Sequence, residues 1–412
     1  MFNSDTLQRF QKIETPFYYY DLDLLKQTLE ACRTASAKYS YHVHYAMKAN
    51  FNPRVLETIQ SYGFGADSVS GNEVRAAVEN GFDKDKVVFA GVGKSDKEIN
   101  YALDADIFCF NVESVQELGI INDLAKAKGK TARVAIRINP NVDADTHHHI
   151  TTGLDENKFG VDIWQLPSVA EALRNCTNLE FMGIHFHIGS QITNMEVYKN
   201  LCIKVNELDL WFQREGFTIK VLNVGGGLGI DYYQPDAKSI PDFEAYFKVF
   251  ADNLTVNPGQ EVHFELGRAL VAQSAALVSR VLFVKNGQKK NFLILDAGMT
   301  ELIRPMLYQA YHQIDNLSKQ FSVLSDELTV DSEQLTVGNS ELAAATHHSQ
   351  LTKYDVVGPI CESTDCFRKD VDLPESFRGD LIVVRTAGAY GEVMASGYNL
   401  RDRVQSVYSS RS

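Results

Sequence analysis

Several groups of residues in this chain have types and spacings that could support chemistry. The first is YHVHYAMKAN, residues 41–50, in which an alternating, strand-like run ends on Lys48. Because side chains alternate across a strand, we expect His42, His44 and Lys48 on one face. A lysine held among apolar neighbours at a strand end has a lowered amine pKa, which suits Schiff-base chemistry. An ordinary solvated lysine fits this stretch equally well.

The second group is GIHFHIGSQ, residues 183–191, at the end of another strand-like run. His185 and His187 share one expected face, and Ser190 follows in the loop. Paired histidines can bind a metal, form hydrogen bonds in a core, or place one ring against a cofactor. For either histidine alone, a core role is the usual one. The triplet 147–149 has no acidic or thiol ligand at convincing spacing, so we expect an exposed loop there.

Two further groups suggest an anion site and a buried charge. NVGGGLG, residues 223–229, has glycines that let backbone N–H groups approach an anion, although a tight turn also needs glycine. FELGR places Glu265 in an apolar run, where a carboxylate needs a partner such as a cationic ring nitrogen or Arg268. A lysine, an anion loop, a stacking imidazole and such a carboxylate are together the groups that a pyridoxal-phosphate site requires.

Composition limits the classes of protein. A chain of 412 residues, 44% of them hydrophobic, can bury a large core in two domains. A net charge of -13 argues against nucleic-acid and anionic-membrane surfaces. Six cysteines without a CxxC pair argue for reduced thiols, and we find neither an apolar leader nor a run of roughly 20 apolar residues. We therefore expect a cytoplasmic enzyme that acts on small molecules.

Strand-like and helical patterns alternate from about residue 22 to residue 268. The strand-like runs are 41–47, 65–69, 86–90, 106–110, 132–138, 179–187, 219–224 and 261–266. Among the helical stretches between them, one has Asn52 to cap it, Pro53 in its first turn and Gly63 to end it. This order predicts a closed (β/α)8 TIM-type barrel, with an open doubly wound sheet as the rival. In the barrel, the groups above meet at one mouth.

The pattern changes after residue 270. ALVSRVLFVK turns at NGQKK and resumes in NFLILDAG, which is typical of a β-hairpin, and YDVVGPI and DLIVVRTAGAY are strand-like. We therefore predict an α/β protein with a barrel domain at 22–268 and a second, all-β domain, sandwich-like or barrel-like, at 1–21 plus 269–412. FYYYD, near the N-terminus, is expected to add a strand to the second domain. Residues 315–350 are polar and lack a clear period, which indicates an extended loop or insertion.

These motifs resemble the family of barrel-type, fold type III pyridoxal-phosphate decarboxylases, and within it the diaminopimelate decarboxylases. YAMKAN, HFHIGSQ and LNVGGGLG are similar to the cofactor-lysine, stacking-histidine and phosphate-loop motifs of the family. TTGLDENKFGV, LDAGMTELIRPMLYQAYH, VVGPICESTD and TAGAYG are similar to signatures of the diaminopimelate branch. The resemblance covers almost the whole chain. It departs at Leu266, where the family usually has proline, and at 315–350, which is longer than usual.

The resemblance implies a role for each site residue. Lys48 would bind the cofactor aldehyde, His187 would stack on the ring, and Glu265 would keep the ring nitrogen protonated, so that the ring accepts electrons as carbon dioxide departs. The phosphate would be surrounded by Ser190, Gly225, Gly226, Gly227, Gly267, Arg268 and Tyr390. Cys361 of a neighbouring subunit would protonate the carbanion, which implies a homodimer with shared sites. Taken alone, this cysteine is more simply a buried apolar thiol or an inert loop residue.

The resemblance also implies how a substrate is recognised. A distal zwitterionic amino acid needs a cationic fork for its carboxylate and an acid for its ammonium. The substrate would be held by Arg268, Arg304, Tyr308, Glu362 and Tyr390. Glu362 would bind the ammonium. Arg304 would be a liability for an ornithine-type precursor, and an interdomain salt bridge is the alternative role for this arginine.

The expected function is pyridoxal 5'-phosphate-dependent decarboxylation of meso-2,6-diaminopimelate to L-lysine and carbon dioxide. This is the last step of lysine biosynthesis, and it would need no metal. A relative acting on carboxynorspermidine or ornithine is the closest alternative. A metal-dependent hydrolase would instead use the HVH and HFH histidines as ligands. A pyridoxal-phosphate carrier would need the barrel and Lys48 but not a β domain that bears CESTD.

Overall fold

The computed structural model describes residues 2–142, 158–320 and 351–409. The chain forms two compact units. The barrel unit comprises Leu22–Ile230 and Ile240–Ala272. The β unit comprises Met1–Asp21, Asp231–Ser239 and Gln273–Ser412. Residues 231–239, which the sequence placed in the barrel range, thus belong with the β unit, and the barrel unit ends at residue 272 rather than 268.

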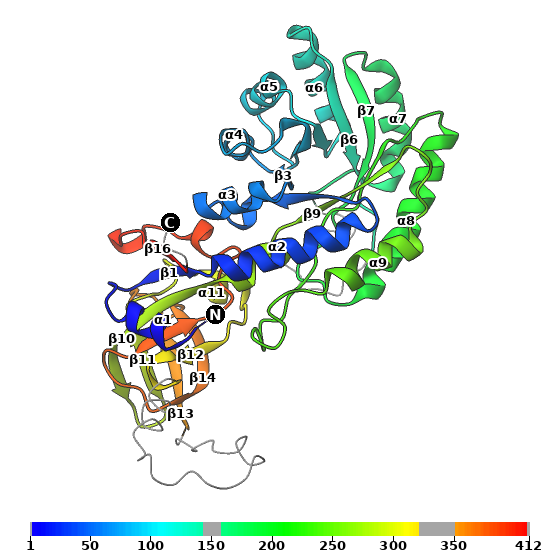
Figure 1. Cartoon of the computed structure of the whole chain (residues 1–412). Helices are drawn as coiled ribbons and strands as arrows, with labels where there is room; N and C mark the ends of the chain where they lie inside the picture. The colour runs from blue at the N-terminus through cyan, green and yellow to red at the C-terminus, as the bar shows by residue number, and fades with distance from the viewer. Residues whose placement is uncertain (1, 143–157, 321–350, 410–412) are drawn as a thin grey trace, which may run out of the picture. The chain divides into compact units, whose positions relative to one another are not determined.

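Eight parallel strands close into a barrel in the first unit (Figure 1). They are β2 (His42–Ala46), β3 (Gly65–Ser68), β4 (Val87–Phe89), β5 (Cys109–Val112), β6 (Ala132–Arg137), β7 (Leu179–His185), β8 (Val221–Asn223) and β9 (Glu261–Leu266). The first and last of these, β2 and β9, pair in parallel and close the ring. The predicted TIM-type barrel is confirmed, and the open doubly wound sheet is wrong.

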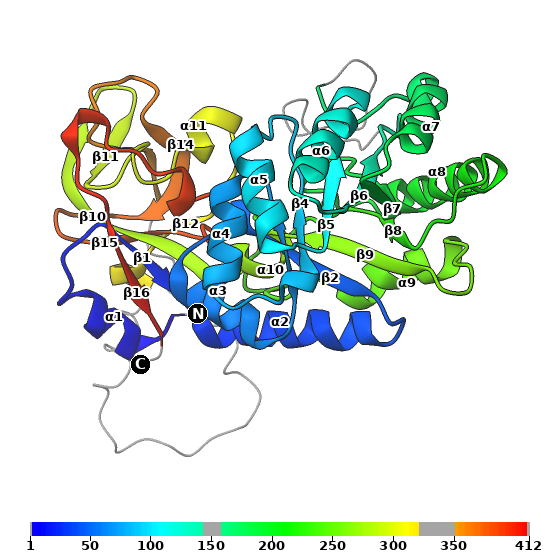
Figure 2. The ribbon, with the colours of Figure 1, turned by 90° about the horizontal axis from the view of Figure 1, so that it is seen from above.

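Helices lie outside the ring of strands (Figure 2). They are α2 (Leu22–Ala37), α3 (Pro53–Ser61), α4 (Gly71–Glu79), α5 (Asp96–Ala105), α6 (Val115–Ala127), α7 (Leu166–Asn175), α8 (Met195–Arg214), α9 (Phe243–Asn253) and the short α10 (Arg268–Val271). Local chemistry sets their ends. At α3, the side chain of Asn52 accepts from the Arg54 N–H, Pro53 is the first helical residue, and Gly63 follows with a φ of 77°.

Most barrel strands differ by one to three residues from the expected bounds, and two of the differences have a clear local cause. β5 begins at Cys109 rather than at residue 106, because Asp106 ends α5 in the left-handed conformation with a φ of 55°. β2 ends at Ala46, and Met47–Ala49 form a 3-10 turn, η1. The alternation of faces therefore stops before Lys48. The prediction that Lys48 shares a strand face with His42 and His44 is wrong, because its side chain projects from this turn.

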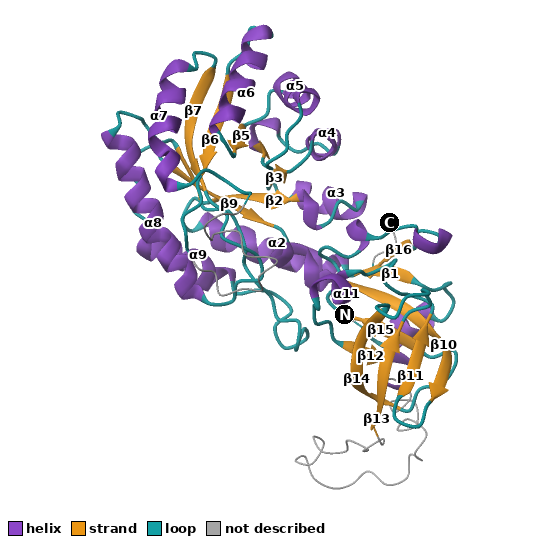
Figure 3. Cartoon of the chain, turned by 180° about the vertical axis from the view of Figure 1, so that it is seen from behind, coloured by secondary structure: helices purple, strands orange, loops and turns teal. Residues whose placement is uncertain are grey.

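The described residues of the β unit form a mostly antiparallel sheet (Figure 3). Its strands are β1 (Phe17–Tyr20), β10 (Ala275–Asn286), β11 (Asn291–Leu295), β12 (Ile314–Asn316), β13 (Leu351–Val357), β14 (Cys366–Pro374), β15 (Leu381–Val384) and β16 (Gln405–Tyr408). Its helices are α1 (Ser4–Phe10), α11 (Arg304–Tyr308) and α12 (Leu317–Gln320). The predicted hairpin is confirmed as β10 and β11, and the FYYY segment pairs with β10.

Large aromatic side chains fill the core of the β unit. Phe10 packs edge-on against Phe17 and Tyr19, with ring centroids 5.1 and 4.9 Å apart. Among the helices that the structure describes, none is both long enough and apolar enough to cross a membrane. The predicted loop at 315–350 is described only at its start, in β12 and α12. The rest of that segment and the histidine triplet 147–149 lie outside the described residues.

Candidate active site

Lys48 lies on η1, at the carboxyl end of β2, between the buried residues Met47 and Ala49. Its Nζ is 3.4 Å from Oδ2 of Asp67 on β3, and its side chain is 35% exposed, whereas that of Asp67 is fully buried. Burial and the nearby Glu265 raise the pKa of Asp67 to about 6, against the opposing effect of Lys48. The amine is therefore held beside a carboxylate at the barrel mouth, where a small molecule can still reach it.

Glu265 is a buried carboxylate on β9 with three hydrogen-bond donors. Asn111 on β5 and Asn223 on β8 both donate to its Oε1 at 2.8 Å, and His185 on β7 lies 2.9 Å from its Oε2. Burial alone raises the pKa of this carboxyl. The His185 ring and the amine of Lys48 outweigh burial, so the pKa lies well below its usual value. Glu265 is thus an ionised acid fixed inside the barrel.

His185 and His187 have different surroundings. Nδ1 of buried His185 has no hydrogen-bond partner among the residues described, as is also true of Oδ1 of Asp67. Burial, followed by the positive charge of Lys48, lowers the pKa of His187 well below its usual value. At neutral pH the His187 ring is therefore a neutral imidazole, and it lies close enough to Lys48 for the charge of the amine to lower its pKa. A neutral imidazole is suited to contact with an aromatic ring.

The HVH and HFH histidines do not form a common metal site. His44 bonds through Nε2 to Nδ1 of His263 at 2.8 Å, while His185 bonds to Glu265. Within the described part of the chain, one group of side chains places three metal-type ligand atoms close together, and it contains no histidine of HFH. The shared ligand set that a hydrolase would need is not formed.

In the glycine-rich loop 223–229, close packing of the backbone requires glycine. A Cβ on Gly225 would lie 2.0 Å from the Phe186 carbonyl oxygen, and one on Gly226 would lie 1.9 Å from that of Glu265. Gly227 has a φ of 103°, which favours glycine. The loop is therefore wedged, backbone against backbone, between the segments that follow β7 and end β9. This wedging brings three of the sequence motifs into contact.

Arg268 and Ser190 lie beside one another at the same end of the barrel. Nη2 of the buried Arg268 donates to Oγ of Ser190 at 3.1 Å. The preceding residue, Gly267, packs against the Lys48 turn, because a Cβ there would lie 3.1 Å from that of Ala49. A guanidinium, a hydroxyl and a glycine-rich loop provide the donors that a phosphate group requires.

In the β unit, Arg304 begins α11 and Tyr308 ends it. Arg304 is 6% exposed, its Nε donates to Nε2 of His312 at 3.3 Å, and its guanidinium lies 5.4 Å above the ring of Tyr232. Its orientation is thus fixed by neighbours of its own unit. Tyr390 is half-buried and has a φ of 56°, an unusual conformation for a non-glycine residue.

The CESTD segment exposes its first two residues and buries its last. Asp365 accepts from the backbone N–H groups of Ile360 and Met299, each at 2.7 Å. Glu362 is exposed and accepts from the Tyr398 hydroxyl at 2.8 Å. Cys361 is also exposed, so the simple interpretation of it as a buried apolar thiol is wrong.

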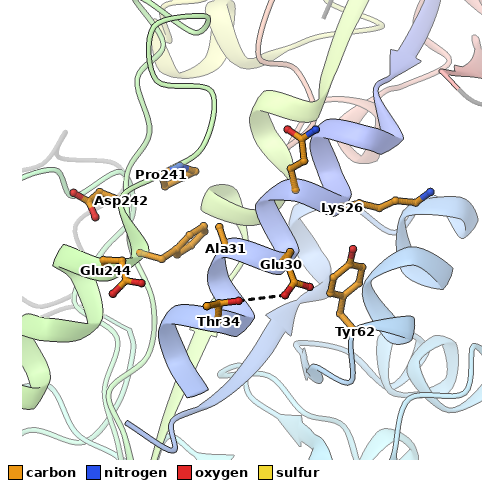
Figure 4. Close-up of a pocket in the computed structure, with 10 residues that line it drawn as sticks. Lys26, Glu30, Ala31, Thr34, Tyr62, Pro241, Asp242 and Glu244 are labelled. Atoms are coloured by element: carbon orange, nitrogen blue, oxygen red, sulfur yellow. Dashed lines mark hydrogen bonds between the residues drawn. The ribbon is translucent and has the colours of Figure 1, made fainter. Parts of the chain in front are cut away.

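A hollow on the outside of the barrel unit does not involve these residues. It lies by α2 and the start of α9 and is lined by side chains that include Lys26, Tyr62 and Asp242 (Figure 4). Glu30 in this hollow accepts from Thr34 at 3.2 Å. None of the side chains that line it is among the predicted site residues. The barrel mouth is therefore the candidate active site.

Comparison with known proteins agrees with this geometry. The model of the pyridoxal-binding domain of pyridoxal-dependent decarboxylases matches residues 23–272. Diaminopimelate decarboxylase of Bacteroides thetaiotaomicron is 52% identical over 397 residues, which cover 96% of each chain. The chain belongs to the diaminopimelate decarboxylase family.

More distant members of the diaminopimelate decarboxylase family match over the same length. The enzyme of Aquifex aeolicus is 39% identical over 96% of this chain and 87% of its own. The crystal structure of diaminopimelate decarboxylase from Helicobacter pylori, complexed with L-lysine, is 36% identical, covers 98% of this chain and 94% of its own, and gives a TM-score of 0.85. Members of this family are carboxy-lyases, so the hydrolase and the non-catalytic carrier are set aside.

Sequence reasoning missed the partners of the two buried acids in this family member. Asn111 and His185 bind Glu265, and Asp67 holds the amine of Lys48. A signal was present, since Asp67 is a polar residue inside a strand-like run and Asn111 directly follows one, and a buried polar group needs a partner. The sequence did not indicate which strands would supply those partners.

Proposed function

We propose that this chain converts meso-2,6-diaminopimelate to L-lysine and carbon dioxide, the last step of lysine biosynthesis, with pyridoxal 5'-phosphate bound at the barrel mouth. The observation that carries the proposal is the amine of Lys48, 3.4 Å from the buried Asp67, in a chain of this family. The six free cysteines suit a reducing compartment, so we place the reaction in the cytoplasm.

The groups at the barrel mouth fit this cofactor. Lys48 would hold its aldehyde carbon, and His187 would lie against its ring. The phosphate would be held by Ser190, Gly225, Gly226, Gly227, Gly267, Arg268 and Tyr390. The buried Oδ1 of Asp67 and Nδ1 of His185 lack partners among the described residues, as expected beside the binding site of a polar group. When bound, pyridoxal phosphate supplies an electron-withdrawing ring, which accepts the electron pair that remains on the substrate carbon when carbon dioxide leaves.

Asp67 and Glu265 have separate tasks in this proposal. An amine must lose a proton before it attacks a carbonyl carbon, and Asp67, with a pKa of about 6, lies within reach of Lys48 to take that proton. Glu265 stays ionised, and its negative charge favours a protonated nitrogen on any ring bound beside it. Asp67 would therefore act as the proton acceptor, and Glu265 would supply a constant negative charge.

Side chains of the β unit would recognise the substrate. Arg304, Tyr308 and Tyr390 of this unit, together with Arg268 of α10 in the barrel unit, would bind its carboxylates, and Glu362 would bind the distal ammonium. Arg304 is held by His312 and Tyr232, so it has little side-chain freedom to lose on binding. This cationic group favours a substrate with a distal carboxylate over an ornithine-type substrate.

Product analysis tests the proposal directly. Purified protein is incubated with pyridoxal phosphate and meso-diaminopimelate, and parallel reactions contain ornithine or carboxynorspermidine. L-lysine and carbon dioxide are expected in equal amounts from the first substrate only. Turnover of ornithine or carboxynorspermidine in place of diaminopimelate would contradict the proposed specificity, and turnover of none of them would contradict the activity.

Replacing Arg304 with alanine is expected to raise KM for diaminopimelate. Loss of a charge-assisted hydrogen bond costs about 2 kcal/mol, or about 30-fold. Steady-state kinetics measure the effect. Arg378→Ala is the matched control, since this arginine also lies over an aromatic ring in the β unit, that of Phe283. Equal KM values for the two variants would remove Arg304 from the binding site.

Mixing inactive Lys48→Ala and Cys361→Ala chains tests whether the homodimer shares its sites. If Cys361 acts on the partner subunit, each heterodimer contains one intact site, and random exchange restores about a quarter of wild-type activity. The exposed position of Cys361, on a loop anchored by Asp365, supports this arrangement. An inactive mixture in which mass spectrometry detects heterodimers would place the cysteine in its own subunit's site.

A further inference from the structure

A group of metal-type ligands lies at the opposite end of the barrel strands from Lys48. His42 begins β2, Glu261 begins β9, and His263 follows two residues later. Oε2 of Glu261 is 3.1 Å from Nε2 of His263 and 4.0 Å from Nε2 of His42. β2 and β9 are the strands that close the barrel, and His42 lies opposite His263 in their register. The group therefore spans the closing pair of strands.

Hydrogen bonds behind His263 determine which of its nitrogens is free. Nδ1 of His44 is 2.9 Å from the Lys86 carbonyl oxygen, which can only accept, so this nitrogen carries a hydrogen. In a ring that carries its hydrogen on Nδ1, Nε2 is the acceptor. That Nε2 is 2.8 Å from Nδ1 of His263, which must then donate. With the hydrogen of His263 on Nδ1, its Nε2 is the nitrogen that faces Glu261 and can bind a cation.

This arrangement calls for a cation. A lone pair and a carboxylate oxygen 3.1 Å apart are two acceptors, and they attract only if a proton or a metal ion lies between them. A proton would serve Glu261 and His263 alone. His42 adds a third ligand, because its ring stacks on that of His263 with centroids 4.7 Å apart, and the three ligand atoms lie within 4.8 Å of one another. A metal ion engages all three.

We propose that His42, Glu261 and His263 bind a divalent transition-metal ion of the zinc class, which ties the first barrel strand to the last. Two histidines and a carboxylate suit zinc better than magnesium or calcium. His44 and the Lys86 carbonyl supply the supporting hydrogen bonds that orient a histidine ligand.

The spacing of the ligands fits such an ion. Ligand atoms about 2.1 Å from zinc are about 3.4 Å apart at the tetrahedral angle. The distances of 3.1 and 4.0 Å from Glu261 lie on either side of this value, and the side chains of Glu261 and His42 are 53% and 46% exposed, so both can adjust. The three residues line a hollow of about 460 Å³, which has room for a water or a small anion as the remaining ligand.

Zinc titration of the untagged, chelator-treated holoenzyme tests the site. Wild type is expected to bind one more zinc ion per chain than His42→Ala or Glu261→Gln, and its thermal midpoint should rise by several degrees, because the ion binds the folded chain. Loss of either ligand is expected to weaken this binding at least about tenfold. Isothermal titration calorimetry and differential scanning calorimetry measure the two quantities.

The variants are chosen to separate binding from folding. His42 and Glu261 are about half exposed and lie outside the candidate active site, so without zinc both variants should match wild type in thermal midpoint and decarboxylation. Other groups that could bind zinc, such as the histidine triplet 147–149 and the cofactor phosphate, are present in every sample. Their contribution is therefore removed when the zinc binding of a variant is subtracted from that of wild type. Equal zinc binding by wild type and both variants, or no zinc binding by wild type, would overturn the proposal and leave a proton as the bridging cation.

Discussion

Replacing Lys48 with alanine is expected to abolish covalent attachment of pyridoxal phosphate and to reduce decarboxylation by about 10²-fold or more, because loss of positioning alone can cost that much. The amine lies 3.4 Å from Asp67, and its charge acts on both His187 and Glu265. Removing it deletes the nucleophile but leaves the phosphate-binding groups intact. The cofactor should therefore still bind, though only reversibly.

Borohydride reduction followed by mass spectrometry measures the attachment. Wild type should gain the mass of one reduced cofactor per chain, and the Lys48 variant should gain none. Lys248→Ala is the matched control, because the ion pair of this exposed lysine within the described residues is with Asp252 on the same helix of the same unit, and such a pair contributes little to stability. A trapped cofactor on the Lys48→Ala chain would show that another amine does the chemistry.

Asp67, beside this amine, makes attachment dependent on pH. Burial raises the pKa of Asp67 to about 6, so this acid is ionised and able to accept a proton above that pH but not below it. Cofactor attachment should therefore slow as the pH falls through about 6. Asp67→Asn, which cannot accept the proton, should attach the cofactor slowly on both sides of that pH. Stopped-flow absorbance of apoenzyme mixed with pyridoxal phosphate follows the rate.

The fold was predictable because its signals are local. Strand period and helix caps such as Asn52 mark elements within a few residues, and eight strand and helix units allow few closed topologies. The errors arose where a single turn decides direction. Because Asp106 has a left-handed conformation at the end of α5, β5 begins later than expected. Because η1 follows β2 directly, Lys48 lies in this turn and not on a face of the strand.

The site was predictable only in part, because its partners come from distant strands. Sequence motifs indicated Lys48, His187 and Glu265, each beside recognisable neighbours. They did not indicate that Asn111, Asn223 and His185 would all bind Glu265, because meeting inside a barrel depends on the register of β5, β7, β8 and β9. For the same reason, the packing role of the loop glycines could be found only from the carbonyl groups that they approach.

Glu265→Gln is the second substitution with a large expected effect. It preserves size but removes the negative charge that would favour a protonated ring nitrogen on the bound cofactor. Loss of one preorganised electrostatic group costs about 10² to 10³ in kcat. KM for diaminopimelate should change little, because the charge acts on the ring and not on the distal groups of the substrate. Steady-state kinetics on the fully loaded enzyme separate the two parameters.

A second readout distinguishes a charge effect from a packing effect. Glu265 raises the pKa of Asp67, so the glutamine variant should move the pH at which cofactor attachment slows below about 6. The pKa of Glu265 itself lies below its usual value, so the wild-type carboxylate is charged between pH 5 and 9 and adds no step of its own to the profile in that range. A purely structural substitution would lower the thermal midpoint without this shift.

Asp209→Asn is the matched control, because this acid is also buried in the barrel unit and accepts hydrogen bonds from three amides, those of Gln213, Asn257 and Gln260. Both substitutions replace a buried carboxylate by an amide, so both should destabilise the fold. Only Glu265→Gln should lower kcat and shift the pH of attachment, because Asp209 lies on α8 and not among the strand ends. Equal kcat values for the two variants would refute the role of the Glu265 charge in decarboxylation.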